Sequence, residues 1–89
     1  MEFQEEVVTE VLRRLRRAEG QVRGVERMLV EERDCREIIN QLAAAIRALE
    51  QAGVRLLANG LTYCIQHPDE SSSNGYTTKE IEDLLLKLR

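Results

Sequence analysis

The feature that most constrains this sequence is a long apolar seam in its second half. Apolar, small and cysteine residues return at spacings of three and four: Cys35, Ile39, Leu42, Ile46, Leu49, Gly53, Leu56, Gly60 and Cys64. This pattern places every member along one side of an α-helix and is typical of coiled coils. A helix with such a seam needs other helices against it, so we expect an all-α protein whose core is completed by other copies of the chain.

A first helix is expected before the seam, from about Glu5 to Glu32. Its apolar residues return every three, four or seven positions and share one face: Val8, Val11, Leu15, Val22, Val25 and Leu29. The seam helix begins at Asp34, because Asp34 and Glu37 form the pattern of a capping box. Pro68 ends it, since a proline disfavours helical backbone at the residue before it, here His67.

A short third helix closes the chain. Residues 69–75 are polar and predict a loop before it. Thr77 and Glu80 form a second capping box, followed by an apolar face: Ile81, Leu84, Leu85 and Leu88. The chain of 89 residues is long enough for one domain, taken as residues 1–89.

The sequence argues against several functional classes. It has no paired carboxylates, catalytic triad or phosphate-binding loop in a recognisable context, so we do not expect an enzyme. Residues 1–6 are acidic where a secretory leader would be basic, and no apolar run would span a bilayer. We therefore expect a cytoplasmic protein without membrane contact. In a reducing compartment its two cysteines are ligands, reactive thiols or inert packing groups rather than a permanent disulfide.

Arginines gather on the first helix although the chain is acidic overall. Residues 13–27 carry six arginines and two glutamates, a local balance of +4 within a net charge of −3. On a helical projection five of them point away from Leu15, as do Gly20 and Gly24: Arg13, Arg16, Arg17, Arg23 and Arg27. Such a stripe, with glycines that allow close approach, can lie along DNA phosphates. The alternatives are a solvated face paired with nearby glutamates, and glycines that permit close helix packing.

The same segment carries a known motif. Residues 13–25 resemble the R-L-x-R-x-x-G-Q-V-x-G signature of the CsoR/RcnR family of repressors, and Cys35, Gln41, residues 43–45 and residues 61–64 extend the resemblance. It implies a three-helix subunit, an antiparallel dimer and a tetramer built as a dimer of dimers. It also implies that basic residues of the first two helices bind double-stranded operator DNA without a helix-turn-helix. The candidates in this sequence are Arg13, Arg14, Arg16, Arg17, Arg23 and Arg55.

Departures from the family pattern indicate the subtype. Copper sensors of this family use Cys, His and Cys, where this sequence has Cys35, Gly60 and Cys64. The N-terminal His of nickel and cobalt sensors is missing, and Glu2 stands where formaldehyde sensors have a proline. The remaining pattern is most similar to the persulfide-sensing CstR branch. It implies that Cys35 and Cys64 are the sensing thiols and that a reactive sulfur species is the inducer, without a metal ion or cofactor.

The spacing of the two cysteines restricts how they can meet. Cys35 and Cys64 are 29 residues apart on one predicted helix, which corresponds to roughly 43 Å. A disulfide needs Cα atoms about 4.4–6.8 Å apart, so the two thiols can pair only between antiparallel helices of two chains.

The two thiols should also differ in reactivity. Cys35 lies in the first turn, where the helix dipole favours a thiolate, and Arg33 and Arg36 flank it, although Asp34 opposes them in part. Cys64 lies in the last turn, where the dipole disfavours a thiolate. Cys35 is therefore the expected nucleophile and Cys64 the resolving thiol.

Two other functions remain open at this point. One is a Cu(I)-sensing repressor with an incomplete ligand set, that is, two thiolates and an unusual or absent third ligand, for which His67, one turn after Cys64, is the candidate. His67 is more simply an exposed residue at a helix end. The other is a structural helical oligomer whose cysteines are inert packing groups.

Overall fold

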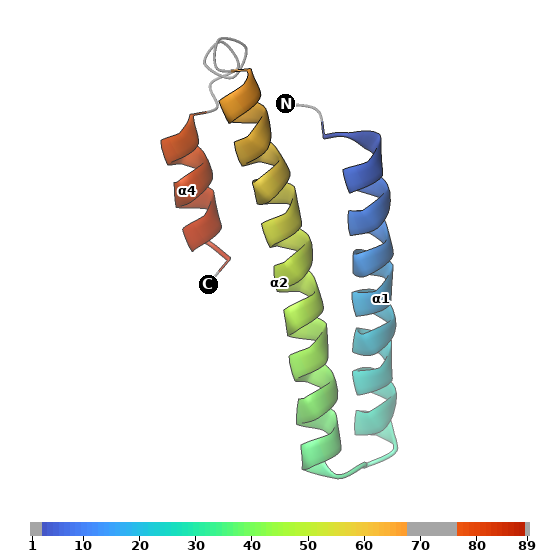
Figure 1. Cartoon of the computed structure of the whole chain (residues 1–89). Coiled ribbons are helices and arrows are strands. Elements are labelled where there is room, and N and C mark those ends of the chain that lie inside the picture. The colour runs from blue at the N-terminus through green and yellow to red at the C-terminus, as the bar shows by residue number, and fades with distance from the viewer. Residues whose placement is uncertain (1–2, 68–76, 89) are drawn as a thin grey trace.

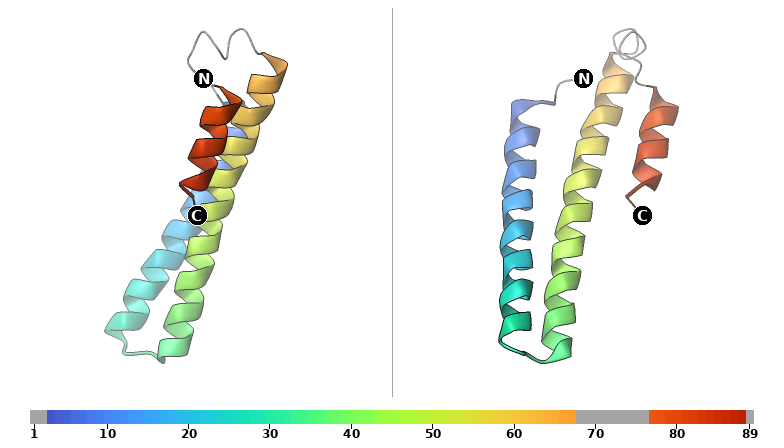
Figure 2. Two further views of the ribbon diagram at one scale, coloured as in Figure 1. Left: turned by 90° about the vertical axis from the view of Figure 1, so that its left-hand side faces the viewer. Right: turned by 180° about the vertical axis from the view of Figure 1, so that it is seen from behind.

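The chain forms three helices, and the second lies between the other two (Figure 1). The computed structural model describes residues 3–67 and 77–88, without the side chain of Cys64. These residues form α1 (Glu5–Val30), α2 (Cys35–Gln66) and α4 (Thr78–Leu86), with no strand among them. α1 and α2 run antiparallel, and α4 lies on the side of α2 away from α1 (Figures 1 and 2). The prediction of an all-α, three-helix chain is confirmed.

At the start of α2, one of the two hydrogen bonds of the predicted capping box is replaced by other contacts. Asp34 is the N-cap, and its Oδ1 accepts a hydrogen bond from the backbone N–H of Arg36 at 2.8 Å. Both oxygens of Glu37, however, accept from the guanidinium of Arg33, at 3.0 and 3.3 Å. The predicted capping box is therefore wrong in its return bond, because the glutamate has a cation within reach one turn back.

The end of α2 is where the sequence places it. His67 leaves the helical region with φ −133° and ψ 61°, and its backbone N–H donates to the carbonyl of Tyr63 at 2.8 Å. Pro68 and the predicted loop at 69–75 lie outside the described residues.

The turn between α1 and α2 stores a small strain. The N–H of Arg33 donates to Met28 at 3.0 Å and that of Glu32 to Leu29 at 3.2 Å, which is a Schellman motif. Its left-handed position is taken by Glu32, with φ 54°, where glycine is usual. The left-handed conformation is unfavourable for a residue with a Cβ, so this turn is less stable with glutamate than it would be with glycine.

The core between α1 and α2 is narrow and built largely from small residues. Among the described residues the buried hydrophobic side chains are Val7, Val11, Ala18, Val25, Ala45, Ala52 and Ile81. Of the apolar face predicted for α1, Val11 and Val25 are buried in the single chain, whereas Val8 and Val22 are each 39% exposed and Leu29 is 60% exposed. The apolar stripe of α1 is broader than one partner helix can cover.

The short α4 packs on the second half of α2. The Thr77 hydroxyl accepts from the N–H of Glu80 at 3.1 Å, which confirms this cap, and Ile81 is buried. Leu88 rests on Gly53, where a Cβ would lie 2.9 Å from its Cδ1. Gly53 is thus a notch filled by α4 rather than an open seam position.

The single chain is elongated. It measures 55 × 24 × 14 Å with a radius of gyration of 16.8 Å, whereas a compact domain of this length has a radius of about 12 Å. No described helix combines the length and apolar character needed to cross a membrane. Along α2, Ile39, Leu42, Ile46 and Leu49 are between 39% and 54% exposed, so this half of the predicted seam is only partly covered within the described chain.

Replacing Glu32 by glycine should raise the stability of the protein. Glycine adopts a φ of 54° without the Cβ clash, so the free energy of unfolding should increase by about 0.5–1 kcal/mol. Urea unfolding at one fixed protomer concentration measures the change. As the control, Glu31→Gly removes a side chain at a φ of −80° and should lower stability. A Glu32→Gly protein no more stable than the parent would contradict the strain argument.

Candidate functional site

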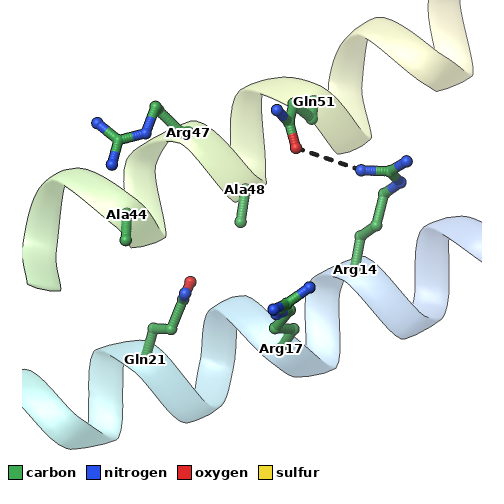
Figure 3. A pocket seen from close by; sticks show the side chains of 7 residues that line it. All are labelled: Arg14, Arg17, Gln21, Ala44, Arg47, Ala48 and Gln51. Carbon is green, nitrogen blue, oxygen red and sulfur yellow. Dashed lines mark hydrogen bonds between the residues drawn. The ribbon is translucent and has the colours of Figure 1, made fainter.

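The hairpin of α1 and α2 has a basic groove along one side. It is a hollow of about 190 Å³ lined by Arg14, Arg17, Gln21, Ala44, Arg47, Ala48 and Gln51, which we call the basic groove (Figure 3). Arg14 and Gln51 reach toward each other across it, with Arg14 Nη1 donating to Gln51 Oε1 at 3.2 Å. Gln21 also points from α1 toward α2, and its Oε1 is buried without a hydrogen-bond partner among the described residues. The groove therefore gathers three guanidiniums, of which that of Arg14 is already hydrogen-bonded, and polar amide groups that an anion can use.

Arg47 is a site residue that the sequence analysis missed. It stands alone in an alanine-rich stretch of α2, far from the arginines of residues 13–27 in the sequence. A usable signal was present, because residues 44, 47, 48 and 51 are spaced by three and four and share one face of α2. The small side chains of Ala44 and Ala48 leave that face open between the charged residues.

The predicted arginine stripe of α1 borders two different grooves. Arg13, Arg16 and Arg17 are exposed, and Arg17 lines the basic groove. Arg23 instead lines a groove on the apolar side of the hairpin. The two nearby glycines also separate: Gly20 has open space around its Cα, whereas Gly24 is buried, and a Cβ there would lie 2.9 Å from Gln41 Nε2. Gly24 therefore serves helix packing, not approach to a ligand.

Glu10 holds two of the candidate arginines. Its carboxylate accepts from Arg14 Nη2 at 3.1 Å and Arg14 Nε at 3.3 Å on its own helix, and from Arg55 Nε at 2.9 Å on α2. These hydrogen bonds, from Arg55 and then from Arg14, lower the pKa of the Glu10 carboxyl below its ordinary value. Arg14 and Arg55 are thus paired within the chain, whereas Arg17 and Arg47 form no ion pair among the described residues.

The other side of the hairpin is apolar. A groove of about 410 Å³ is lined by Leu15, Ala18, Glu19, Val22, Arg23, Glu26 and Leu49, which we call the apolar groove. Leu49 and Arg47 are two residues apart on α2 and therefore point to opposite sides of it. The hairpin presents charge on one side and hydrophobic surface on the other, as a subunit does when one side meets a polyanion and the other meets a second subunit.

Cys35 lies in the first turn of α2, as predicted, and it is exposed. The two arginines beside it are not free cations. Arg33 pairs with Glu37 at 3.0 Å and Glu31 at 3.7 Å, and Glu37 raises the pKa of Arg33 above its ordinary value. Arg36 lies 3.8 Å from the carboxylate of Asp34. Both arginines that flank Cys35 in the sequence are thus paired with carboxylates.

Cys64 lies near the opposite end of the same uninterrupted helix. Its side chain is outside the described part of the structure. Since α2 runs without a break from Cys35 to Gln66, the backbones of the two cysteines are separated by roughly 43 Å. The structure does not bring the two predicted sensing residues together within one chain.

His67 is engaged locally. Its Nδ1 lies 3.3 Å from the carbonyl oxygen of Tyr63, and the two rings stack with centroids 4.6 Å apart. Gly60, where copper sensors of the resembled family carry a ligand, is buried. Within the described residues no three His, Cys, Asp or Glu side chains are grouped to hold a metal ion.

Comparisons with known proteins agree with this geometry. The sequence profile of a family described as metal-sensitive transcriptional repressor matches residues 8–88. The chain is 42% identical over 53 residues to the copper-sensing transcriptional repressor RicR of Mycobacterium tuberculosis, covering 60% of this chain and 55% of RicR. It is 30% identical over 78 residues to the copper-sensing transcriptional repressor CsoR of Bacillus subtilis, covering 88% and 77% of the two chains. The chain therefore spans little more than half the length of RicR.

A solved structure shares the fold. The crystal structure of the copper-sensing repressor CsoR with Cu(I) from Geobacillus thermodenitrificans matches with a TM-score of 0.80 at 31% identity. The match covers 98% of this chain and 91% of that one.

We expect copies of the chain to associate through the apolar side of the hairpin. Replacing Leu49 by Glu places a carboxylate in that surface, and its desolvation should shift the protein toward monomer in sedimentation velocity at micromolar concentration. The matched control is Arg47→Glu, two residues away on the basic side, which should leave the oligomer intact. A folded monomer for the parent, or equal effects of the two substitutions, would contradict this assignment.

Proposed function

This chain belongs to the family of metal-sensitive transcriptional repressors, and we propose that within it the chain is a repressor switched by reactive sulfur species through Cys35 and Cys64 of two subunits. Membership rests on the family profile, which matches residues 8–88. The family consists of transcriptional repressors, not enzymes. The inducer, the thiol pair and the DNA surface are the proposal.

One observation carries the thiol part of the proposal. α2 is a single unbroken helix with a cysteine near each end, so any Cys35–Cys64 site requires a second chain. The exposed apolar side chains that follow Cys35 on α2, namely Ile39, Leu42 and Ile46, supply a surface on which the second chain can pack.

The chemistry of the switch needs only a persulfide, RSSH, and the two thiols. The Cys35 thiolate attacks the outer sulfur of RSSH, forms Cys35–S–SH and releases RSH. The Cys64 thiolate of the second chain then attacks Sγ of Cys35. The bond between Sγ and the outer sulfur breaks, HS⁻ leaves, and the Cys35–Cys64 disulfide forms. Two thiols are oxidised, and the persulfide is reduced to RSH and H₂S. The cross-link fixes two chains together at the ends of α2 and alters the arrangement that binds DNA.

The basic groove supports the DNA part of the proposal. Arg17 and Arg47 come from different helices, line one groove and form no ion pair among the described residues, so both are available to phosphate oxygens. Arg13 and Arg16 are exposed on the adjoining surface of α1. We propose these residues as backbone contacts to double-stranded operator DNA, with Arg14, Arg23 and Arg55 as further candidates.

Cu(I) sensing is the second candidate function. It is favoured by the relatives, since RicR and both CsoR proteins are described as copper-sensing or contain Cu(I). Two thiolates from two chains would bind a soft ion such as Cu(I). Against it stands Gly60, which has no side chain to act as a ligand. His67 is stacked on Tyr63 rather than free, which leaves the third ligand unsupplied.

Replacing Arg17 or Arg47 by Ala should weaken DNA binding and its dependence on salt. Each lost phosphate contact should lower the salt slope of log K by about 0.9, because fewer counterions are released. DNA is obtained by selecting genomic fragments retained by the reduced parent protein, and binding is followed by fluorescence anisotropy at several salt concentrations. Arg13→Ala should behave alike. Arg36→Ala is the control, since its side chain is 92% exposed at the far end of the hairpin. Equal salt slopes for all variants would show that these arginines form a solvated face and do not contact DNA.

Cys35→Ser should abolish both cross-linking and release from DNA on treatment with a persulfide donor. Cys64→Ser should leave Cys35 persulfidated but unable to form the covalent dimer. Non-reducing denaturing electrophoresis reports the dimer, mass spectrometry the modified residue, and anisotropy the release.

Three results would count against this switch: a cross-link within one chain, release of Cys35→Ser by the donor, or release by stoichiometric Cu(I) alone. The last result would favour the copper function. Absence of DNA binding by the parent together with intact oligomers would favour a structural role.

A further inference from the structure

Glu10 occupies an unusual place among the ion pairs of the described residues. The other pairs join residues of one helix or of its adjoining turn, namely Arg33 with Glu31 and Glu37, Arg36 with Asp34, and Lys79 with Asp83. The Glu10 carboxylate alone joins arginines of both helices of the hairpin, Arg14 on α1 and Arg55 on α2. Both arginines are candidates for DNA contact.

All three guanidinium nitrogens of Arg14 are engaged in hydrogen bonds. Its Nε and Nη2 donate to Glu10 at 3.3 and 3.1 Å, and its Nη1 donates to Gln51 at 3.2 Å. Arg55 uses its Nε on the same carboxylate, at 2.9 Å. Arginine binds phosphate best through two parallel N–H groups, and the carboxylate engages Arg14 through such an edge.

We propose that Glu10 is an internal competitor for oxyanions, whose carboxylate holds on Arg14 and Arg55 the position that a phosphate group of DNA takes. Binding of a phosphate there requires Glu10 to be displaced, so Glu10 lowers the affinity of the hairpin for polyanions. The identification of DNA as the polyanion rests on the proposed function, whereas the competition itself applies to any phosphate or sulfate group.

Three features favour a competitor over a clamp that holds the helices together. The side chains of Glu10, Arg14 and Arg55 are 28%, 36% and 44% exposed, and ion pairs in such positions contribute little to stability. The helices already pack at this level through Val7, Val11 and Ala52. Arg14 also lines the basic groove, so the cluster opens directly onto the surface where Arg17 and Arg47 are unpaired among the described residues. The lowered pKa of Glu10 keeps the competitor charged at neutral pH.

Glu10→Gln should therefore bind polyanions more tightly than the parent. One or two recovered contacts correspond to about 3- to 10-fold tighter DNA binding and a salt slope steeper by about 0.9 per contact. The matched control is Glu6→Gln, which removes the same charge one turn earlier on α1, from an exposed residue without an ion pair in the described part of the chain. All proteins are compared on the selected genomic DNA and on heparin–agarose, where the salt concentration at elution is read. Circular dichroism confirms that each is folded.

The two readouts separate the outcomes. Later elution and tighter DNA binding of Glu10→Gln than of Glu6→Gln, lost again when Arg14 and Arg55 are also changed to Ala, would support the proposal. Equal behaviour of the two variants would show that only net charge matters, and weaker binding of Glu10→Gln would show that Glu10 positions the arginines; either result overturns it. Later elution from heparin with no DNA bound by any of the proteins would support the competition and reject DNA as the partner.

Discussion

The unbroken length of α2 is the constraint on which the rest of this molecule depends. Its 32 residues carry a cysteine near each end, and a helix of that length cannot fold back on itself to bring them together. α1 and α4 both pack on it from different sides (Figure 1). A chemical event at Cys35 can therefore involve Cys64 only through a second subunit, so the sensing chemistry that we propose requires assembly.

A narrow core is the second consequence of this architecture. Where α1 meets α2 the buried residues include Ala18, Ala45 and Ala52, and the larger apolar side chains of both helices remain largely exposed. Small residues allow the helix axes to approach closely but bury little apolar area. The hairpin thus has two exposed sides of different character, one apolar and one basic. One carries Leu15, Val22 and Leu49 and suits a second subunit, while the other carries Arg14, Arg17 and Arg47 and suits a polyanion.

Ion pairs within the chain determine how many of its arginines are available to bind an anion. Arg33 and Arg36 flank the exposed thiol in sequence, yet carboxylates of Glu37, Glu31 and Asp34 lie within 4 Å of them. Arg14 and Arg55 are likewise held by Glu10. A count of arginines along the chain overstates the field that a ligand meets, because exposed guanidiniums readily find glutamates one helical turn away. Of the three arginines that line the basic groove, Arg17 and Arg47 form no ion pair among the described residues.

The sequence by itself determined the helices, their main boundaries and the separation of the thiols. These follow from local rules: Asp34 and Thr77 cap helices through their own side chains, and the backbone leaves the helix at His67, the residue before Pro68. Only the tertiary structure decided which side of each helix is inside. Val22 and Leu29 follow the helical period as well as Val11 and Val25 do, but one neighbouring helix covers only part of so broad a stripe. The tertiary structure also decided which residues pair across the helices. Arg55 pairs with Glu10, 45 residues away in the sequence, and Gly24 packs against the side chain of Gln41. Contacts between distant segments depend on how the helices pack, and helical periodicity carries no information about the partner.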